Sequence, residues 1–198
     1  MKKIVALVGA VVLFFSCDVA KQMTGAYALL TQCKYVFNSI TGLSIAGVNL
    51  QNINSISSLN PLALANLLAA FATSSGSLPL NFDLNLDVTN TGDQAAVLNG
   101  IDYILAIDGM EMTQGLMKQQ IQIGAGKKAL MPISMTFDLK KVMSGQTLDA
   151  MKNLAFNFAG IGNSSSNVSL KLKPSFVLNG STVTAPDFIP ISFTLNKK

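Results

Sequence analysis

Apolar and polar residues alternate without a break between residues 81 and 89. Phe82, Leu84, Leu86 and Val88 fall on one side, and Asn81, Asp83, Asn85, Asp87 and Thr89 fall on the other. Successive side chains of a strand point to opposite faces, so this period predicts a strand with one dry and one wet face. Ile101, Tyr103, Leu105 and Ile107 repeat the pattern. Such strands need a second layer to cover their apolar face.

Further apolar runs predict more strands of the same kind. They lie at residues 34–50, 110–116, 119–123, 131–139, 168–172, 176–184 and 191–195. Asp108-Gly109 joins two of the runs and indicates a tight hairpin, whose two turn positions need positive φ. We expect a bulge at Gly115, an edge position or a strand start at Pro132, and a strand end at Lys173-Pro174. Strands spaced about ten residues apart predict a β-sandwich or barrel.

Two segments change to helical spacing. Pro61–Ala72 is rich in Leu and Ala, and Asn60 before it is a candidate N-cap. Leu148, Met151, Ala155 and Phe158 share one face of a second helix. The first helix is too short to cross a bilayer, and we interpret it as a cover over one open end of the sandwich. A mobile flap over an apolar pocket and a membrane-surface helix are the alternatives.

The N-terminal segment is typical of a bacterial lipoprotein. Lys2 and Lys3 precede twelve apolar residues, 4–15, which is the length of a signal-peptide core. Ser16-Cys17 resembles a lipobox, so Cys17 is expected to carry acyl chains and to become the mature N-terminus. An ordinary secretory signal with a chance cysteine is the alternative. We therefore divide the chain into a signal peptide at 1–16, a lipidated tether or short helix at 17–33, and a single domain at 34–198.

Composition narrows the possible functions. The chain holds 14 Lys, 10 acids, no His and no Arg, and removal of Lys2 and Lys3 leaves 12 Lys against 10 acids, a net charge of +2. That balance does not favour nucleic-acid binding, and without His neither an imidazole triad nor a histidine metal site can form. We expect no catalytic residues, no metal and no cofactor. Cys33 is expected to be a buried small hydrophobe rather than a reactive thiol.

Three patterns invite a sharper interpretation that the sequence does not support. Gly124-Ala125-Gly126-Lys127 lacks the other residues of a phosphate loop and is interpreted as a turn. Asp83 and Asp87 lie four residues apart on one strand, about 13 Å, too far to share one ion. We interpret both as part of a solvated face. Five methionines at core-facing positions favour core packing, with an adaptable apolar pocket as the alternative; they are Met110, Met112, Met131, Met135 and Met151.

Residues 78–139 resemble the LEA type 2 (late embryogenesis abundant) family, also described as the WHy domain. The matching positions are Leu84-Asn85-Leu86-Asp87-Val88-Thr89-Asn90, Ala95-Ala96-Val97-Leu98, Ile101-Asp102-Tyr103-Ile104-Leu105, Ile107-Asp108-Gly109, Gly115, and residues 132–139. Thr91 stands where the family usually has Pro. The resemblance implies an all-β immunoglobulin- or fibronectin-like sandwich with one or two short covering helices. It also implies a noncatalytic, often stress-associated protein, and it carries over no catalytic residue.

Together these patterns predict a lipid-anchored β-sandwich in a Gram-negative cell envelope, most simply at the outer membrane. Its expected role is a noncatalytic stress-protective or interaction module, with the membrane as one partner through the anchor at Cys17. A carrier of an apolar ligand, held between the sheets and under Pro61–Ala72, is the second hypothesis. An enzyme that works without His is the third, and it would need Ser, Lys and Asp side chains converging in a cleft.

Overall fold

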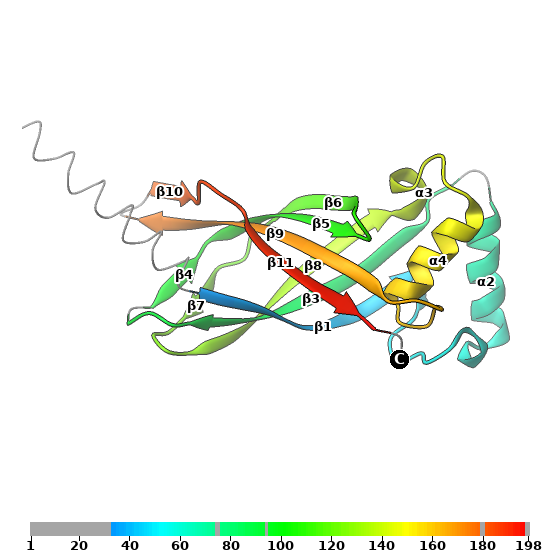
Figure 1. The fold of residues 1–198 in the computed structure, drawn as a ribbon, viewed down its shortest axis with the longest axis horizontal. Coiled ribbons are helices and arrows are strands. Elements are labelled where there is room, and N and C mark those ends of the chain that lie inside the picture. Colours follow the sequence, from blue (N-terminus) through cyan, green and yellow to red (C-terminus); the bar gives the residue numbers. More distant parts are fainter. Residues whose placement is uncertain (1–32, 74–75, 94, 179–180, 197–198) are drawn as a thin grey trace, which may run out of the picture.

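Two antiparallel β-sheets face each other across one apolar core (Figure 1). The structure, a computed structural model, describes residues 33–73, 76–93, 95–178 and 181–196. The first sheet has the order β2-β1-β3-β8, with β1 Cys33–Ile45, β2 Val48–Asn49, β3 Pro79–Asn90 and β8 Lys128–Asp138. The second has the order β10-β9-β5-β6, with β5 Gly100–Ile107, β6 Met110–Met117, β9 Ser166–Leu178 and β10 Ser181–Thr184. The fold is the expected all-β sandwich with minor helices.

Three more strands remain, of which one joins the second sheet. β11 Ile189–Leu195 pairs with the first part of β9, and β10 pairs with its last part. β4 Ala96–Leu98 and β7 Ile121–Ile123 form a small separate ladder. The expected hairpin at Asp108-Gly109 is confirmed, since both residues have positive φ and join β5 to β6. The edge position of Pro132 is also confirmed, because among the described strands β8 pairs with β3 alone.

The inner faces of both sheets supply the core. The apolar side chains of β3 predicted to be dry are all buried, as are those of β8 and most of those of β5 and β9; they are Phe82, Leu84, Leu86, Val88, Met131, Ile133, Met135, Phe137, Ile101, Leu105, Ile107, Val168, Leu170 and Leu172. Of the five methionines singled out, Met112, Met131 and Met135 are buried and the other two are partly buried. The period of two therefore selected the core correctly.

Pro174 does not end its strand, contrary to the sequence-based expectation. β9 continues through it, and Pro174 pairs with Ile101 of β5. On the other side of β9, the partner changes from β11, which pairs as far as Leu172, to β10, which starts at Ser175. Proline lacks the N–H that a ladder needs, so this change of partner is a place where a strand can accept it.

Gly115 is not the bulge. The extra residue of β6 is Met112, between the pairs Leu105–Thr113 and Ala106–Glu111. Gly115 lies opposite Tyr103 instead, and a Cβ added there would approach the Tyr103 hydroxyl oxygen to 2.6 Å. Glycine is thus required because an aromatic ring covers its backbone.

The helices gather at one end of the sandwich, which we call the helical end (Figure 1). α2 spans Pro61–Ala72, and Asn60 Oδ1 accepts a hydrogen bond of 2.8 Å from the Ala63 N–H, which confirms the expected cap. α4 spans Leu148–Phe158, α3 spans Leu139–Val142, and a short 3-10 turn, η1, spans Ile56–Ser58. Phe71 of α2 packs edge-on against Phe156 of α4, with ring centroids 5.8 Å apart. α2 therefore covers an end of the core, as expected.

β1 starts at the opposite end, which we call the Cys33 end (Figure 1). Cys33 is 6% exposed, and burial raises the pKa of its thiol, so the expectation of a buried small hydrophobe is confirmed. The proposed signal peptide, Cys17 and the segment up to residue 32 lie outside the described residues.

Candidate functional site

The outer face of the first sheet carries the acidic residues that the sequence singled out. The register aligns side chains across β1, β3 and β8 in rows. From the Cys33 end, these rows are Lys34–Thr89–Lys128, Val36–Asp87–Leu130, Ser39–Asn85–Pro132, Thr41–Asp83–Ser134 and Ser44–Asn81–Thr136. The face therefore has two parts: two rows with lysines and aliphatic residues, then three rows that are almost wholly polar.

The three polar rows form a hydrogen-bonded set that we call the polar ladder. Asn85 donates to Thr41 Oγ1 at 2.9 Å and to Ser39 Oγ at 3.3 Å. Ser134 donates to Asp83 Oδ1 at 2.5 Å, and Thr136 donates to Asn81 Oδ1 at 2.9 Å. The expected wet face is less wet than the alternation suggests, because Asn85 is only 5% exposed. Neighbouring strands cover the middle of a sheet even where no second layer does.

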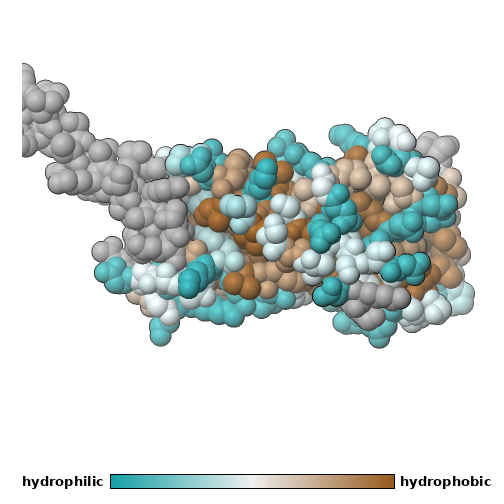
Figure 2. Space-filling model, in the orientation of Figure 1, coloured by the Kyte–Doolittle hydropathy of each residue, from teal (hydrophilic) through white to brown (hydrophobic). Residues whose placement is uncertain are grey.

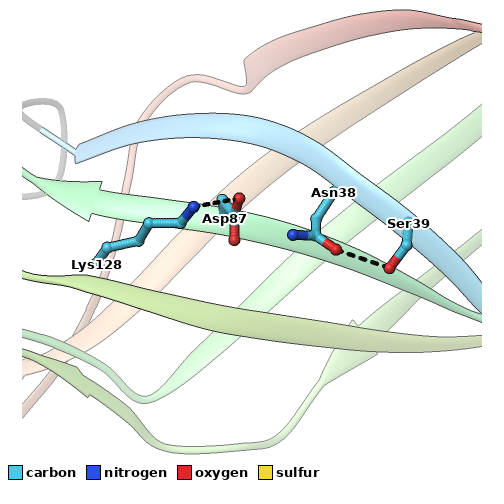
Figure 3. Close-up of polar contacts among 4 residues, drawn as sticks. All are labelled: Asn38, Ser39, Asp87 and Lys128. Carbon is cyan, nitrogen blue, oxygen red and sulfur yellow. Dashed lines mark hydrogen bonds and ion pairs between the residues drawn. The ribbon is translucent and has the colours of Figure 1, made fainter.

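Asp87 joins the polar ladder to the rows at the Cys33 end (Figure 3). Lys128 Nζ lies 2.6 Å from Asp87 Oδ2, and Ser39 donates to Asn38 Oδ1 at 2.8 Å. Hydrogen bonds from the Lys128 and Asn38 side chains hold the pKa of the Asp87 carboxyl below its usual value. Asn38 is the extra residue of a bulge in β1, which turns its amide toward Asp87. Ser, Lys and Asp side chains thus come together here, but on an open sheet face rather than in a cleft.

The two rows nearest the Cys33 end expose apolar side chains. Val36 is 58% exposed and Leu130 is 55% exposed, with Asp87 between them. Lys34 and Lys128 occupy the adjacent row, and the Lys128 side chain is 58% exposed. We call these four residues the Cys33-end face. Sequence reasoning missed it, since the register between β1 and β8 is needed to bring the four residues together.

A second apolar surface lies at the helical end. α2 has no charged residue, and Leu62 and Leu68 are 71% and 45% exposed. Figure 2 shows hydrophobic residues on the surface at this end of the molecule. Beside α2, a shallow groove of about 480 Å³ runs along η1 and β2. Its lining is mixed, with the apolar residues Val48, Ile53, Leu59, Leu62 and Ala63 beside the polar residues Asn49, Ser58, Asn60 and Asn66. α2 therefore presents an uncharged apolar side to its surroundings while it covers the core.

A small crevice lies between β1, the C-terminal end of α4 and the end of β11. Its volume is about 140 Å³, and most of its lining is apolar: Ile40, Leu43, Leu50, Phe158, Ala159 and Leu195. Gln51 also lines it, and Gln51 Oε1 is a buried atom without a hydrogen-bond partner among the described residues. None of the lining residues belongs to α2, so this crevice is not the ligand space expected under that helix.

The remaining candidates have structural roles. The Gly124–Lys127 segment is a turn between β7 and β8, closed by the Lys127 N–H on the Gly124 carbonyl at 3.0 Å. Asp83 and Asp87 have separate partners. Asp138 accepts hydrogen bonds from the Leu78 N–H at 2.9 Å and the Lys140 N–H at 3.0 Å. Within the described ranges, no three metal-ligating side chains come together and no helix is long and apolar enough to cross a membrane.

Comparisons with known proteins return structures alone. No family model matches the chain, and no curated protein matches it. A protein from Archaeoglobus fulgidus is 9% identical, with a TM-score of 0.39, over 82% of this chain and 98% of its own. A protein from Arabidopsis thaliana is 14% identical, with a TM-score of 0.42, over 59% and 70%. A candidate late embryogenesis abundant (LEA) protein is 11% identical, with a TM-score of 0.40, over 95% and 89%. At these scores the likeness carries no argument about function.

Proposed function

We propose that this chain is a noncatalytic interaction module, held at an envelope membrane by acyl chains on Cys17 and acting through the exposed surface of its β-sandwich. The observation that carries the proposal is the uncharged exposed surface of α2, where Leu62 is 71% exposed and Leu68 is 45% exposed. Exposed leucines on a helix free of charge are typical of a surface that a partner covers. The sequence pattern at residues 1–17 supports the anchor, and the LEA type 2-like motifs support a role in stress protection.

The arrangement of the two ends agrees with such a role. β1 starts at the Cys33 end, and α2 lies at the helical end, so the sandwich separates the two (Figure 1). Thirteen residues of β1 at about 3.3 Å each span about 40 Å. An anchor that enters at one end leaves the apolar side of α2 accessible at the other.

The anchor is tested by the intact mass of the protein extracted from membranes of its own host. A chain that starts at Cys17 and carries acyl mass, which a Cys17→Ala variant lacks, supports the proposal. A chain cut elsewhere without acyl mass would mean a secreted soluble domain and would remove the membrane from the proposed function.

The interaction surface is tested by a photo-crosslinking residue placed at Leu62 in the host cell. We expect a discrete adduct at Leu62 that disappears when Leu68→Lys is added, because a charge on the exposed surface of the same helix opposes its burial against a partner. The matched position is Thr136, exposed in the polar ladder, where no discrete adduct is expected. Equal adducts at both positions would show that α2 has no special role.

A second candidate function is the binding of a small apolar ligand, and the crevice beside Gln51 favours it. Its volume of about 140 Å³ is close to that of engineered cavities of about 150 Å³ that hold benzene. A ligand that donates a hydrogen bond would satisfy Gln51 Oε1. Native mass spectrometry of gently delipidated protein tests this: a stoichiometric adduct lost in Gln51→Leu supports it, and its absence in the unsubstituted chain refutes it.

A further inference from the structure

We propose that the Cys33-end face docks on the anionic headgroups of the membrane that holds the chain, with Lys34 and Lys128 on the phosphates and Val36 and Leu130 in the apolar boundary. The inference rests on the proposed function and goes beyond it, because a tether alone does not orient the domain. It assigns one side of the sandwich to the lipid.

The geometry of the face supports a flat contact. Val36 and Leu130 lie in the row Val36–Asp87–Leu130, and the two lysines lie in the adjacent row, Lys34–Thr89–Lys128. Val36 and Leu130 are the two large apolar residues exposed on the outer face of this sheet, among the residues described, while the polar ladder bonds its own side chains. An exposed aliphatic pair beside lysines is the composition of a surface that lies in a membrane interface.

The charges of the face fit an anionic surface. Lys127, exposed in the turn before β8, adds a third lysine at this end. Asp87 is the acid within the rows, and it is already paired with Lys128 at 2.6 Å. Asp93 lies in the loop that follows β3 and is a second acid near this end of the chain path, so the three lysines named here outnumber these two carboxylates. Each lysine near an anionic bilayer strengthens the contact about five-fold.

The position of the anchor favours this side. Fifteen residues lie between Cys17 and Cys33, and the sixteen steps along the backbone reach at most about 55 Å when fully extended. Because the chain enters at the Cys33 end, this end is held at a high local concentration near the bilayer, and even a weak contact there is populated. The lipid surface is thus the occupant that both the anchor and the lysines select, over a soluble protein partner.

The test reads membrane contact at two positions of the full chain, as the host processes it. Leu130→Cys and, separately, Leu62→Cys are labelled with an environment-sensitive dye, and buried Cys33 is controlled by labelling the unsubstituted chain. The chain is placed on vesicles of phosphatidylcholine with or without phosphatidylglycerol that carry spin-labelled lipid. We expect quenching at Leu130 to exceed that at Leu62 on the anionic vesicles and to be lost in 1 M salt, where the Debye length is about 3 Å.

A charge variant gives the sharper comparison. Lys34→Glu with Lys127→Glu removes two lysines and keeps the Asp87–Lys128 pair; it should lower the ratio of docked to free face at least about 25-fold. Lys141→Glu with Lys171→Glu makes the same change in charge at exposed positions elsewhere and should leave the quenching unchanged.

The proposal would be overturned by equal quenching at both dyes or by stronger quenching at Leu62. It would also be overturned if quenching at Leu130 did not depend on lipid charge or on the substitutions at Lys34 and Lys127. The intact mass of the same sample separates the two hypotheses. A chain without acyl mass removes the anchor from the proposed function, while the quenching at Leu130 still decides whether this face binds the bilayer.

Discussion

The two faces of β3 are stabilised in different ways, although their residues alternate along one strand. On the inner face, Phe82, Leu84, Leu86 and Val88 are at most 3% exposed and belong to the apolar core. On the outer face, Asn81, Asp83, Asn85 and Asp87 find partners one strand away, on β1 and β8. The inner face depends on the removal of apolar surface from water, whereas the outer face depends on the register that brings polar groups together.

The difference shows which features of the fold can be predicted from a short stretch of sequence. Any residue of suitable size and hydrophobicity can serve the inner face, so its pattern is visible within ten residues. A pair such as Lys128 and Asp87 exists only after β3 and β8 have paired, across 41 positions of the chain. The following substitutions test this contrast.

The largest effect is expected from Leu84→Asp. Leu84 is fully buried, so the new carboxylate has no partner and no water, and we expect a loss of about 4 kcal/mol or more in the free energy of unfolding. Leu130→Lys also introduces a charge, but on the exposed face of the neighbouring strand and opposite Asp87, so it should cost less than about 0.5 kcal/mol. Urea unfolding followed by circular dichroism measures both. Similar losses in the two variants would show that the faces of the sheet are assigned wrongly.

A smaller loss is expected from Asn85→Ala, within the outer face. Its amide donates to Thr41 and Ser39 while only 5% exposed, so its removal should cost about 1–2 kcal/mol. Thr136→Ala, at an exposed position of the same polar ladder, should cost less than about 0.5 kcal/mol. The same urea titration compares them, and equal losses would mean that burial of the polar ladder has no energetic consequence.

Asp138 lies on the outer face of the sheet, at the helical end. Its carboxyl makes the stability of the fold depend on pH. Burial raises the pKa of this carboxyl, but the N–H donors of Leu78 and Lys140 outweigh burial and hold the pKa below the usual 3.8. A carboxyl with a lowered folded-state pKa stabilises the fold above its ordinary pKa, and this contribution is lost as the pH falls through the folded value. Asp138→Ala should therefore cost about 1 kcal/mol at pH 7 through the lost cap of α3.

The difference between Asp138→Ala and the unsubstituted chain should shrink as the pH falls below 4, when unfolding midpoints are measured across a pH series. Asp149→Ala is the control, because its side chain is 86% exposed and its ion pair with Lys152 is long, at 3.5 Å. A difference for Asp138→Ala that stays constant with pH would show that the N–H donors do not select the charged form.

The smallest effects are expected from Asp83→Asn and Asp87→Asn. Asparagine keeps the size of the side chain and an oxygen that accepts from Ser134 or Lys128, and both sites border solvent. The thermal midpoints should match that of the unsubstituted chain. A clear drop in either would mean that the carboxylate charge itself holds β8 to β3.

Local chemistry made much of this fold predictable. The period of two assigned the buried residues of β3, β5 and β8; Asp108-Gly109 fixed a hairpin; and Asn60-Pro61 fixed the start of α2. The predictions that failed share one cause, because at these positions the neighbouring strand, and not the local sequence, determines the structure. Pro174 is tolerated because β11 is replaced by β10 beside it, and Gly115 is required because Tyr103 lies over it. The Cys33-end face was invisible for the same reason, since its residues come from strands far apart in the sequence.

The bulges of β1 bear on how copies of the protein behave when crowded. β1 shifts its register between Phe37 and Ser39 and again between Thr41 and Ser44, and Phe37 stacks on Phe193 of β11 with ring centroids 3.9 Å apart. Pro132 interrupts the backbone donors of β8, the opposite edge of the same sheet. A new strand needs a regular row of free backbone groups to add to a sheet. Neither edge of this sheet has such a row over its whole length. The sheet therefore resists strand pairing between molecules, even at a concentration that would drive open edges into fibrils.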